Sequence, residues 1–335
     1  VESGMVLGGI VWIISYFQYI LLDGKFYTMF SLLFGIGFSI IISNAMRKHA
    51  DGFRIFYRRM GILLVIGFLH LMFLWSGDIL MLYALLGLLL PLFRNVSNKG
   101  LLLASAFLLL VPIAADAARA VSGMDPSAPV VHMQQYFCVK YGITEDNFAF
   151  WLRDAASYTD VFKFLVQGAF VRMQEFIDGN RFFKVMGLFL LGFYIGRNRL
   201  YANLEGNKKL LKKVSMYGFA IGLPVSVFYA WSSMNGHPWG MTVHSALYAF
   251  GVFPVGLAYM ASVSLWYLHR RECRIFKILA APGQMALTNY IGQSVLGMII
   301  FYGIGFGFGA DTGLVAVMLV AAGVYLVEAA FSNIW

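Results

Sequence analysis

Charged side chains are scarce in this sequence. Only 12% of its 335 residues are Asp, Glu, Lys or Arg, whereas soluble globular proteins carry about 25%. Apolar residues make up 60% of the chain, so the few charged groups cannot cover a water-facing surface of this size. This scarcity excludes an ordinary soluble enzyme and a disordered chain, and it indicates a polytopic membrane protein.

Cysteines and the common cofactor motifs are few or absent. The two cysteines, Cys138 and Cys273, make neither a disulfide framework nor a zinc-binding spacing. The sequence has no Walker A motif, no H-E-x-x-H and no C-x-x-C pair. We therefore expect no bound metal, no covalently bound cofactor and no ATP-driven pumping. No charged segment with a cleavage site precedes the first apolar run, so we also expect no secretory signal peptide.

Long apolar runs are abundant. A membrane-spanning helix needs about 20 mainly apolar residues, and the run at 5–22 could either span or lie along the outer interface. We therefore predict an all-α membrane helix bundle with nine to ten transmembrane helices in a single membrane domain over residues 1–335. The candidate spans are 5–22, 26–44, 60–75, 79–93, 101–115, 183–195, 214–231, 243–268, 290–308 and 314–331.

The basic residues gather in alternate loops. With a cytoplasmic N-terminus, 17 of the 25 basic residues fall in loops on the inner side, as the positive-inside rule requires. The C-terminus is then cytoplasmic, and the long segment 116–182 forms an extracytoplasmic cap. The formal charge of +9 is thus a signal of topology, and we expect no nucleic-acid partner.

A histidine within an apolar run is the leading candidate for a functional residue. The runs 60–75 and 79–93 are joined by a short turn at 76–78, and His70 lies eleven residues after Arg59. That separation places His70 about 16 Å along the helix, near the membrane midplane. An ionisable group there is costly and marks a functional site, although a neutral histidine bonded to a backbone carbonyl or a tyrosine is the alternative. Asp78 could partner it or cap the following helix.

Two further charged or titratable residues lie near predicted outer helix ends. Lys25 could bind an anionic substrate or extend to the membrane interface, and we favour the second. His244 could support the site from its edge. Gly35 and Gly37, in the span that follows Lys25, permit close helix packing.

Polar residues also mark the start of the run 290–308. Asn289 and Gln293 share one helix face at i, i+4 spacing, with Tyr290 beside them. Interhelical hydrogen bonding and substrate binding are equally good interpretations of this face. Glu328, near the inner end of the last run, is expected to reach the interface.

Three segments resemble the YeiB-like family of bacterial inner-membrane proteins, a domain of unknown function. They are GKFYTMFSLLFGIGF at 24–38, RRMGILLVIGFLHLMFLWSGDIL at 58–80 and ALTNYIGQS at 286–294, and the most specific part is G-x-x-H…W-x-G-D-I-L around His70 and Asp78. The family is distantly similar to transmembrane acyltransferases of the heparan-α-glucosaminide acetyltransferase type. This resemblance implies an inner-membrane protein that transfers an acyl group from cytosolic acyl-CoA to an extracytoplasmic acceptor.

These observations give one leading hypothesis. His70 would act as general base or transient acyl carrier, Asp78 would orient it, and Trp75 would bind substrate beside them. Arg58 and Arg59 would hold the phosphates of acyl-CoA, the expected cosubstrate. The alternatives are a small-solute transporter or channel that uses the same polar cavity, and a structural membrane protein. The expected partners are the lipid bilayer and a small molecule, and the sequence does not indicate an oligomeric state.

Overall fold

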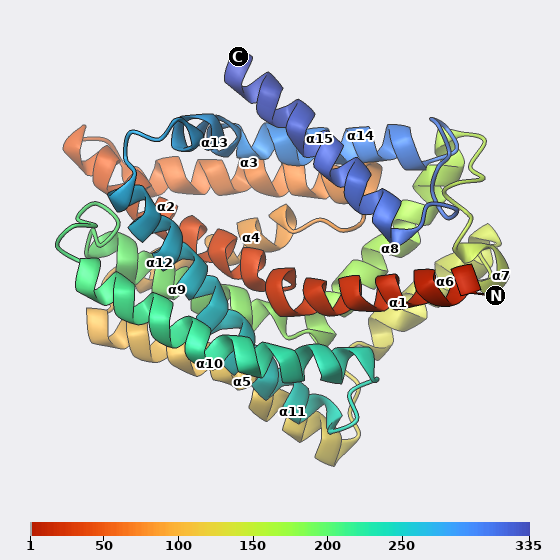
Figure 1. Ribbon diagram of the computed structural model, residues 1–335, viewed down its shortest axis with the longest axis horizontal. Helices are drawn as coiled ribbons and strands as arrows, with labels where there is room; N and C mark the ends of the chain where they lie inside the picture. Colours follow the sequence, from red (N-terminus) through yellow and green to blue (C-terminus); the bar gives the residue numbers. More distant parts are fainter. Residues whose placement is uncertain (1) are drawn as a thin grey trace. The chain divides into compact units, whose positions relative to one another are not determined.

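Helices are the only regular elements in the part of the chain that the computed structural model describes, residues 2–335 (Figure 1). The predicted all-α class is therefore confirmed. The elements are α1 (Glu2–Phe17), the π-helix η1 (Gln18–Leu22), α2 (Lys25–Arg47), α3 (Gly52–Phe73), α4 (Leu80–Gly87), the 3-10 helix η2 (Leu90–Phe93), α5 (Asn98–Ser122), α6 (Ala128–Tyr141), α7 (Glu145–Phe148), α8 (Tyr158–Asp178), α9 (Arg181–Arg197), α10 (Lys208–Met234), α11 (Gly240–Leu247), the π-helix η3 (Tyr248–Val252), α12 (Phe253–His269), α13 (Arg274–Gln284), α14 (Ala286–Phe301) and α15 (Leu314–Ile334).

Six helical segments of the described residues are long and apolar enough to cross a membrane, which supports the assignment to the membrane class. Two further helices, Leu80–Phe93 and Ala286–Phe301, are apolar but shorter. The predicted spans 5–22 and 26–44 fall largely within one of the six segments, so a count of nine to ten crossings stays a prediction. The six segments are Val11–Arg47, Gly52–Phe73, Asn98–Ser122, Lys208–Met234, Gly240–His269 and Leu314–Ile334.

The connection between α3 and α4 is longer than the three-residue turn at 76–78 that the sequence predicts. Helix α3 ends at Phe73, two residues before the predicted end, and α4 begins at Leu80. Helix α4 is only eight residues long, because Pro91 lies in the 3-10 turn that follows it and proline cannot continue the α-helical hydrogen bonding. Trp75 therefore lies in the turn itself and not in a helix.

The chain divides into two compact units. The first unit comprises residues up to Leu63, Leu82–Asp125 and Gly179–Arg270; the second comprises Leu64–Met81, Pro126–Asp178 and Arg271–Trp335. The segment predicted as an extracytoplasmic cap, 116–182, contains α6, α7 and α8. Its side of the membrane stays a prediction.

In the first unit, α2 and α9 are in backbone contact through glycines. A Cβ atom added to Gly35 would lie 2.1 Å from the carbonyl oxygen of Phe189, and one added to Gly192 would lie 2.1 Å from that of Leu32. Small residues allow such close approach between apolar helices. Gly37, which we expected to serve the same purpose, has nothing within 4 Å of an added Cβ, so only Gly35 of the pair makes the close contact.

We expect Gly35→Ala to lower the free energy of unfolding by about 2 kcal/mol or more, because the added methyl group overpacks a rigid backbone contact. The change is measured by unfolding of the purified protein in mixed micelles. Gly37→Ala is the matched control, since it adds the same methyl group two residues away in open space. Equal losses for the two variants would contradict the assigned contact.

In the second unit, a small core joins α8 to the end of α14. Val161 and Leu165 of α8 are fully buried against Ala155 and Tyr302. Gly67 of α3 allows the backbone at Met81 to approach, since a Cβ there would lie 2.5 Å from the Met81 nitrogen. These contacts fix the hairpin between α3 and α4 within this unit.

Candidate functional site

The hairpin turn is held by an arginine from α8. Arg172 donates from Nε to the carbonyl oxygen of Asp78 at 2.8 Å and from Nη2 to that of Gly77 at 3.0 Å. Its third nitrogen, Nη1, bonds Glu175 at 2.6 Å. The turn carbonyls are thus fixed by a charged donor, which makes strong hydrogen bonds.

His70 and Asp78 meet at the base of this turn. His70 Nδ1 lies 3.0 Å from Asp78 Oδ1, and both side chains are buried, with 1% of each exposed. Among the described residues, His70 Nδ1 has no hydrogen-bond partner of good geometry, so its contact with Asp78 is a close approach of the ring nitrogen to the carboxylate. Asp78 Oδ2 accepts a hydrogen bond from the Met81 amide at 2.8 Å. Asp78 therefore has both contacts that the sequence suggested: it lies beside His70, and it accepts a hydrogen bond at the start of α4.

A serine completes the arrangement. His70 Nε2 lies 2.7 Å from Ser294 Oγ on α14, so the imidazole contacts a carboxylate on one side and a hydroxyl on the other. We call Asp78, His70 and Ser294 the relay residues. Sequence reasoning did not select Ser294, although it lies one helical turn after Tyr290 and so shares its face.

Tyr290 braces the relay residues from α14. Its hydroxyl lies 3.4 Å from Asp78 Oδ1 and accepts a hydrogen bond from the Ile79 amide at 3.3 Å. The ring centroid lies 4.8 Å from that of His70. Tyr290 therefore contacts the site that the sequence associated with it, through both its hydroxyl and its ring.

Asn289 and Gln293 are directed toward α15. Gln293 Nε2 donates to Glu328 Oε2 at 2.7 Å, and Asn289 Nδ2 donates to Ser332 Oγ at 3.0 Å. The expectation that Glu328 reaches the interface is wrong: its side chain is buried, because the Gln293 amide supplies a donor within the bundle. These contacts have the form of interhelical hydrogen bonding, and Gln293 also borders a pocket.

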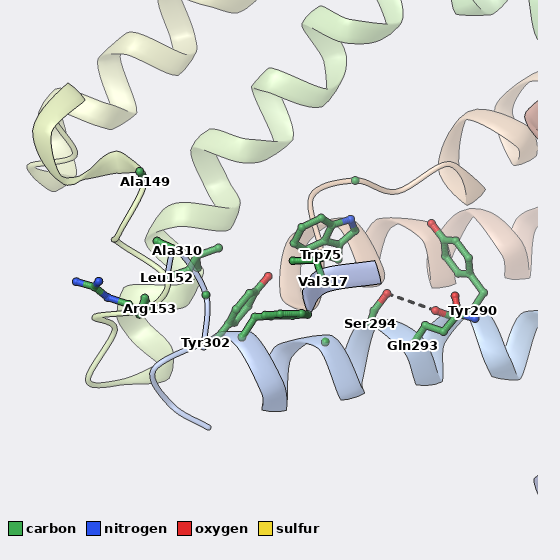
Figure 2. Close-up of a pocket in the computed structure, with 14 residues that line it drawn as sticks. Trp75, Ala149, Leu152, Arg153, Tyr290, Gln293, Ser294, Tyr302, Ala310 and Val317 are labelled. Carbon is green, nitrogen blue, oxygen red and sulfur yellow. Dashed lines mark hydrogen bonds between the residues drawn. The ribbon is translucent and has the colours of Figure 1, made fainter. Parts of the chain in front are cut away.

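A pocket of about 570 Å³ begins at Ser294. Figure 2 shows Ser294, Tyr290 and Gln293 close together on α14, with Trp75 nearby and Tyr302 farther along. One face of α14 borders the pocket, at positions that repeat every three to four residues. The lining residues are Trp75, Gly77, Ala149, Leu152, Arg153, Tyr290, Gln293, Ser294, Gly297, Phe301, Tyr302, Gly309, Ala310 and Val317.

The character of the pocket changes along its length. Polar side chains surround its Ser294 end, whereas beyond Gly297 the walls are mostly apolar. At the far wall, Arg153 bonds Asp154 at 2.7 Å and Asp311 at 2.9 Å. The hydrogen bond from Arg153 holds the pKa of the Asp154 carboxyl below its usual range. A polar head with an apolar tail fits this distribution of groups.

Two tyrosines satisfy the carbonyls at the end of α3. Tyr158 donates to the carbonyl oxygen of Phe73 at 2.6 Å, and Tyr302 donates to that of Leu74 at 3.4 Å. Burial raises the pKa of the Tyr158 hydroxyl, so it stays a donor. The last turn of α3, which carries His70, is therefore anchored at carbonyls that a helix end leaves without intrahelical partners.

Lys25 and His244 come together elsewhere, in the first unit. Lys25 does not extend outward as we expected: its side chain is fully buried, and Nζ donates to the carbonyl oxygen of Tyr19 in η1 at 2.7 Å. The ammonium lies 5.5 Å from the ring centroid of Tyr229, and His244 stacks on the same ring at 4.9 Å. Asp23 accepts a hydrogen bond from the Tyr229 hydroxyl at 2.6 Å.

More buried polar groups of the first unit were not selected from the sequence. Lys184 is buried with its ammonium 3.9 Å from the ring centroid of Tyr248. Asp116 accepts hydrogen bonds from Asn180, at 2.9 Å, and from Ser245. Lys184 lies in the apolar run 183–195 and Asp116 directly follows the run 101–115, and a single charged residue at such a place is a weak signal when its neighbours in space are unknown.

The two arginines that we expect to bind acyl-CoA are exposed, and their contacts do not outline a binding site. Arg58 and Arg59 are exposed on α3. Among the described residues, no group of three or more His, Cys, Asp or Glu side chains is arranged to hold a metal ion.

Comparison with known proteins gives relatives without an assigned activity. Residues 195–335 match the family described as "Protein of unknown function (DUF418)". "Uncharacterized protein YxaH" of Bacillus subtilis (strain 168) is 29% identical over 313 residues, which cover 92% of this chain and 74% of that protein. "Uncharacterized protein YeiB" of Escherichia coli (strain K12) is 24% identical over 330 residues, 93% of this chain and 77% of that protein.

A third relative extends the same pattern, and solved structures add nothing to it. The "Uncharacterized 39.9 kDa protein in amylase 3'region" of Bacillus acidopullulyticus is 27% identical over 320 residues, covering 95% of this chain and 77% of that protein. No solved structure matches the chain. The family matched at residues 195–335 and the relatives matched over more than nine-tenths of the chain confirm its resemblance to the uncharacterised YeiB-like family.

Proposed function

We propose that this protein is a membrane acyltransferase that moves an acyl group from cytosolic acyl-CoA to an extracytoplasmic hydroxyl or amine. The observation that carries the proposal is the buried His70, which contacts the Asp78 carboxylate through one nitrogen and the Ser294 hydroxyl through the other. That hydroxyl also borders a pocket with a polar end and an apolar end. A base, its orienting carboxylate and a space for an acyl chain are the groups that acyl transfer needs.

His70 would act as the general base. Its Nε2 would accept the proton of the attacking hydroxyl, and Asp78 would hold the ring and stabilise the imidazolium that forms. The carbon–sulfur bond of the thioester breaks as the new carbon–oxygen bond forms, and His70 returns the proton to the departing thiolate. General base catalysis of this kind contributes about 10²–10⁴-fold in rate.

The predicted position of these residues in the bilayer would let the reaction move an acyl group across it. With the predicted topology, Arg58 and Arg59 lie toward the inner end of α3, and His70 lies in the last turn of the same helix, toward the outer side. These arginines would hold the phosphates of acyl-CoA while the acceptor approaches from the outer side. Transfer at this depth would let the acyl group cross the membrane without moving either whole substrate.

The apolar part of the pocket would take the acyl chain. Gly297 lies three residues after Ser294, borders the pocket, and has nothing within 4 Å of an added Cβ. We expect Gly297→Leu to lower kcat/KM for palmitoyl-CoA by about 10-fold or more while acetyl-CoA changes little, because one or two displaced methylene groups are worth about 1–3 kcal/mol. Chain-length profiles of the two proteins measure this.

Gly323→Leu is the control for this prediction. Gly323 lies on α15, also has nothing within 4 Å of an added Cβ, and does not border the pocket. Its chain-length profile should match that of the wild type. A uniform loss over all chain lengths in Gly297→Leu would instead indicate that the pocket does not hold the chain.

Reconstituted transfer across a membrane tests the proposed function directly. Proteoliposomes are loaded with acetyl-CoA, octanoyl-CoA or palmitoyl-CoA, hydroxylamine outside serves as a small amine acceptor, and protein-free liposomes give the rate of its direct reaction with the thioester, which is subtracted. The proposal expects acyl hydroxamate outside and free CoA thiol inside in equal amounts. Failure of the wild type to form hydroxamate from any of the three thioesters would overturn it.

Transport is the second candidate, and a specific observation favours it. Lys25, Lys184 and Asp116 of the first unit are buried in apolar helices, and ionisable groups in such places commonly mark ion or solute pathways. The test is proton flux in the same proteoliposomes, followed with trapped pyranine and without acyl-CoA. Flux that is lost in Lys184→Met, together with no hydroxamate, would favour the transporter.

A further inference from the structure

We propose that Ser294 is the nucleophile of this reaction and carries the acyl group as an ester between two half-reactions. The inference rests on the proposed acyltransferase function and deepens it, since that function alone requires only a base. Ser294 Oγ lies 2.7 Å from His70 Nε2, and His70 Nδ1 lies 3.0 Å from Asp78 Oδ1. A hydroxyl beside a base that a third group orients is the arrangement of an activated nucleophile.

Access distinguishes the serine from the histidine as the acyl carrier. Ser294 is half-buried and borders the pocket, whereas His70 is 2% exposed and does not border it. Both ring nitrogens of His70 already face relay residues, Nδ1 toward Asp78 and Nε2 toward Ser294. A thioester carbonyl in the pocket therefore meets the serine oxygen first, and His70 acts as the base and not as the carrier.

The two half-reactions balance without any further reagent. In the first, His70 Nε2 takes the Ser294 proton, Oγ attacks the thioester carbonyl, the carbon–sulfur bond breaks, and the proton leaves with the CoA thiolate. In the second, His70 takes the proton of the acceptor hydroxyl or amine, which attacks the Ser294 ester. The ester carbon–oxygen bond breaks, and His70 returns the proton to Oγ.

A purely structural role for the serine makes a different prediction. Ser294 Oγ also lies 3.3 Å from the carbonyl oxygen of Tyr290, four residues earlier, as hydroxyls inside helices often do. This contact is the dashed line in Figure 2. The distance from Ser294 Oγ to His70 Nε2 is shorter, at 2.7 Å. Of the two partners of the hydroxyl, the proposed base is therefore the nearer one. A structural serine could be replaced by alanine with transfer preserved.

Trapping the ester tests the inference. The full-length protein in proteoliposomes is incubated with radiolabelled octanoyl-CoA and no acceptor, quenched in acid, and mapped by peptide mass spectrometry. We expect one label per chain on the peptide that contains Ser294, released by hydroxylamine. Ser294→Ala should lose the label and lower hydroxamate formation by about 10³-fold, whereas Ser294→Cys should retain the label as a thioester.

Ser264→Ala is the matched control, because Ser264 Oγ makes the same bond to a carbonyl four residues earlier, to Met260 at 2.8 Å. It should label and transfer as the wild type does. Transfer at the wild-type rate by Ser294→Ala, or an ester mapped to another residue, would overturn the nucleophile while leaving the acyltransferase function in place. Absence of transfer by the wild type would overturn both. Labelled Ser294→Cys shows that loss in the alanine variant is not misfolding.

Discussion

His70→Ala is expected to lower acyl transfer by about 10³-fold, within the range that a positioned general base contributes. The substitution removes the imidazole, which contacts the Ser294 hydroxyl through one ring nitrogen and the Asp78 carboxylate through the other. The thioester would still enter the pocket, so the loss should fall on kcat and leave KM within a few-fold. Initial rates of hydroxamate formation in proteoliposomes give both parameters.

His132→Ala serves as the control for this variant. His132 lies in α6 of the same unit, is exposed, and takes no part in the relay. It should transfer at the wild-type rate. If His70→Ala keeps the wild-type kcat, the buried histidine has a packing role and the proposed base is wrong.

The second large effect is expected for Asp78→Asn. This substitution separates the two roles of Asp78, as the charged partner of His70 and as the cap of α4. The amide oxygen of asparagine can still accept the hydrogen bond from the Met81 amide, so the free energy of unfolding should change by less than about 1 kcal/mol. The negative charge beside His70 Nδ1 is lost, and the amide nitrogen favours the wrong tautomer. We expect kcat to fall by about 10²-fold or more.

Asp78→Ala completes the comparison, since it removes the charge and the helix cap together. Its kcat should fall as far as that of Asp78→Asn, with an additional loss of about 0.5–2 kcal/mol in unfolding free energy. Unfolding in mixed micelles and transfer kinetics are measured on both variants. Full activity in Asp78→Asn would reduce Asp78 to a helix cap.

The relay shows which parts of a site a sequence can predict. His70 and Asp78 are eight residues apart in one hairpin, so local geometry alone brings them near each other. Ser294 lies 224 positions after His70, and no periodicity within α14 indicates which helix its polar face contacts. The sequence does indicate the polar face, through Asn289, Tyr290 and Gln293. Which of these residues contacts the relay residues and which contacts α15 depends on helix packing.

The wrong expectations share one physical cause. Lys25 and Glu328 were expected at the interface because a lone charge in an apolar run is costly to bury. Glu328 instead accepts a hydrogen bond from Gln293 of the preceding helix. Lys25 donates to the Tyr19 carbonyl in the π-helix η1 and lies beside the Tyr229 ring. Hydropathy reports the average environment of a helix and so predicts the helices and the membrane class, but it does not identify such pairs.

The bonds from Arg172 to the carbonyls of Gly77 and Asp78 have a consequence for exchanging parts between relatives. The turn that carries Asp78 takes its shape from a residue of α8, more than 90 positions later in the chain. A chimera whose imported α8 lacks this arginine would keep every relay residue and still lose the support of that turn. The smallest interchangeable part of this molecule is therefore α8 together with the hairpin at Gly67–Met81, inherited as one piece.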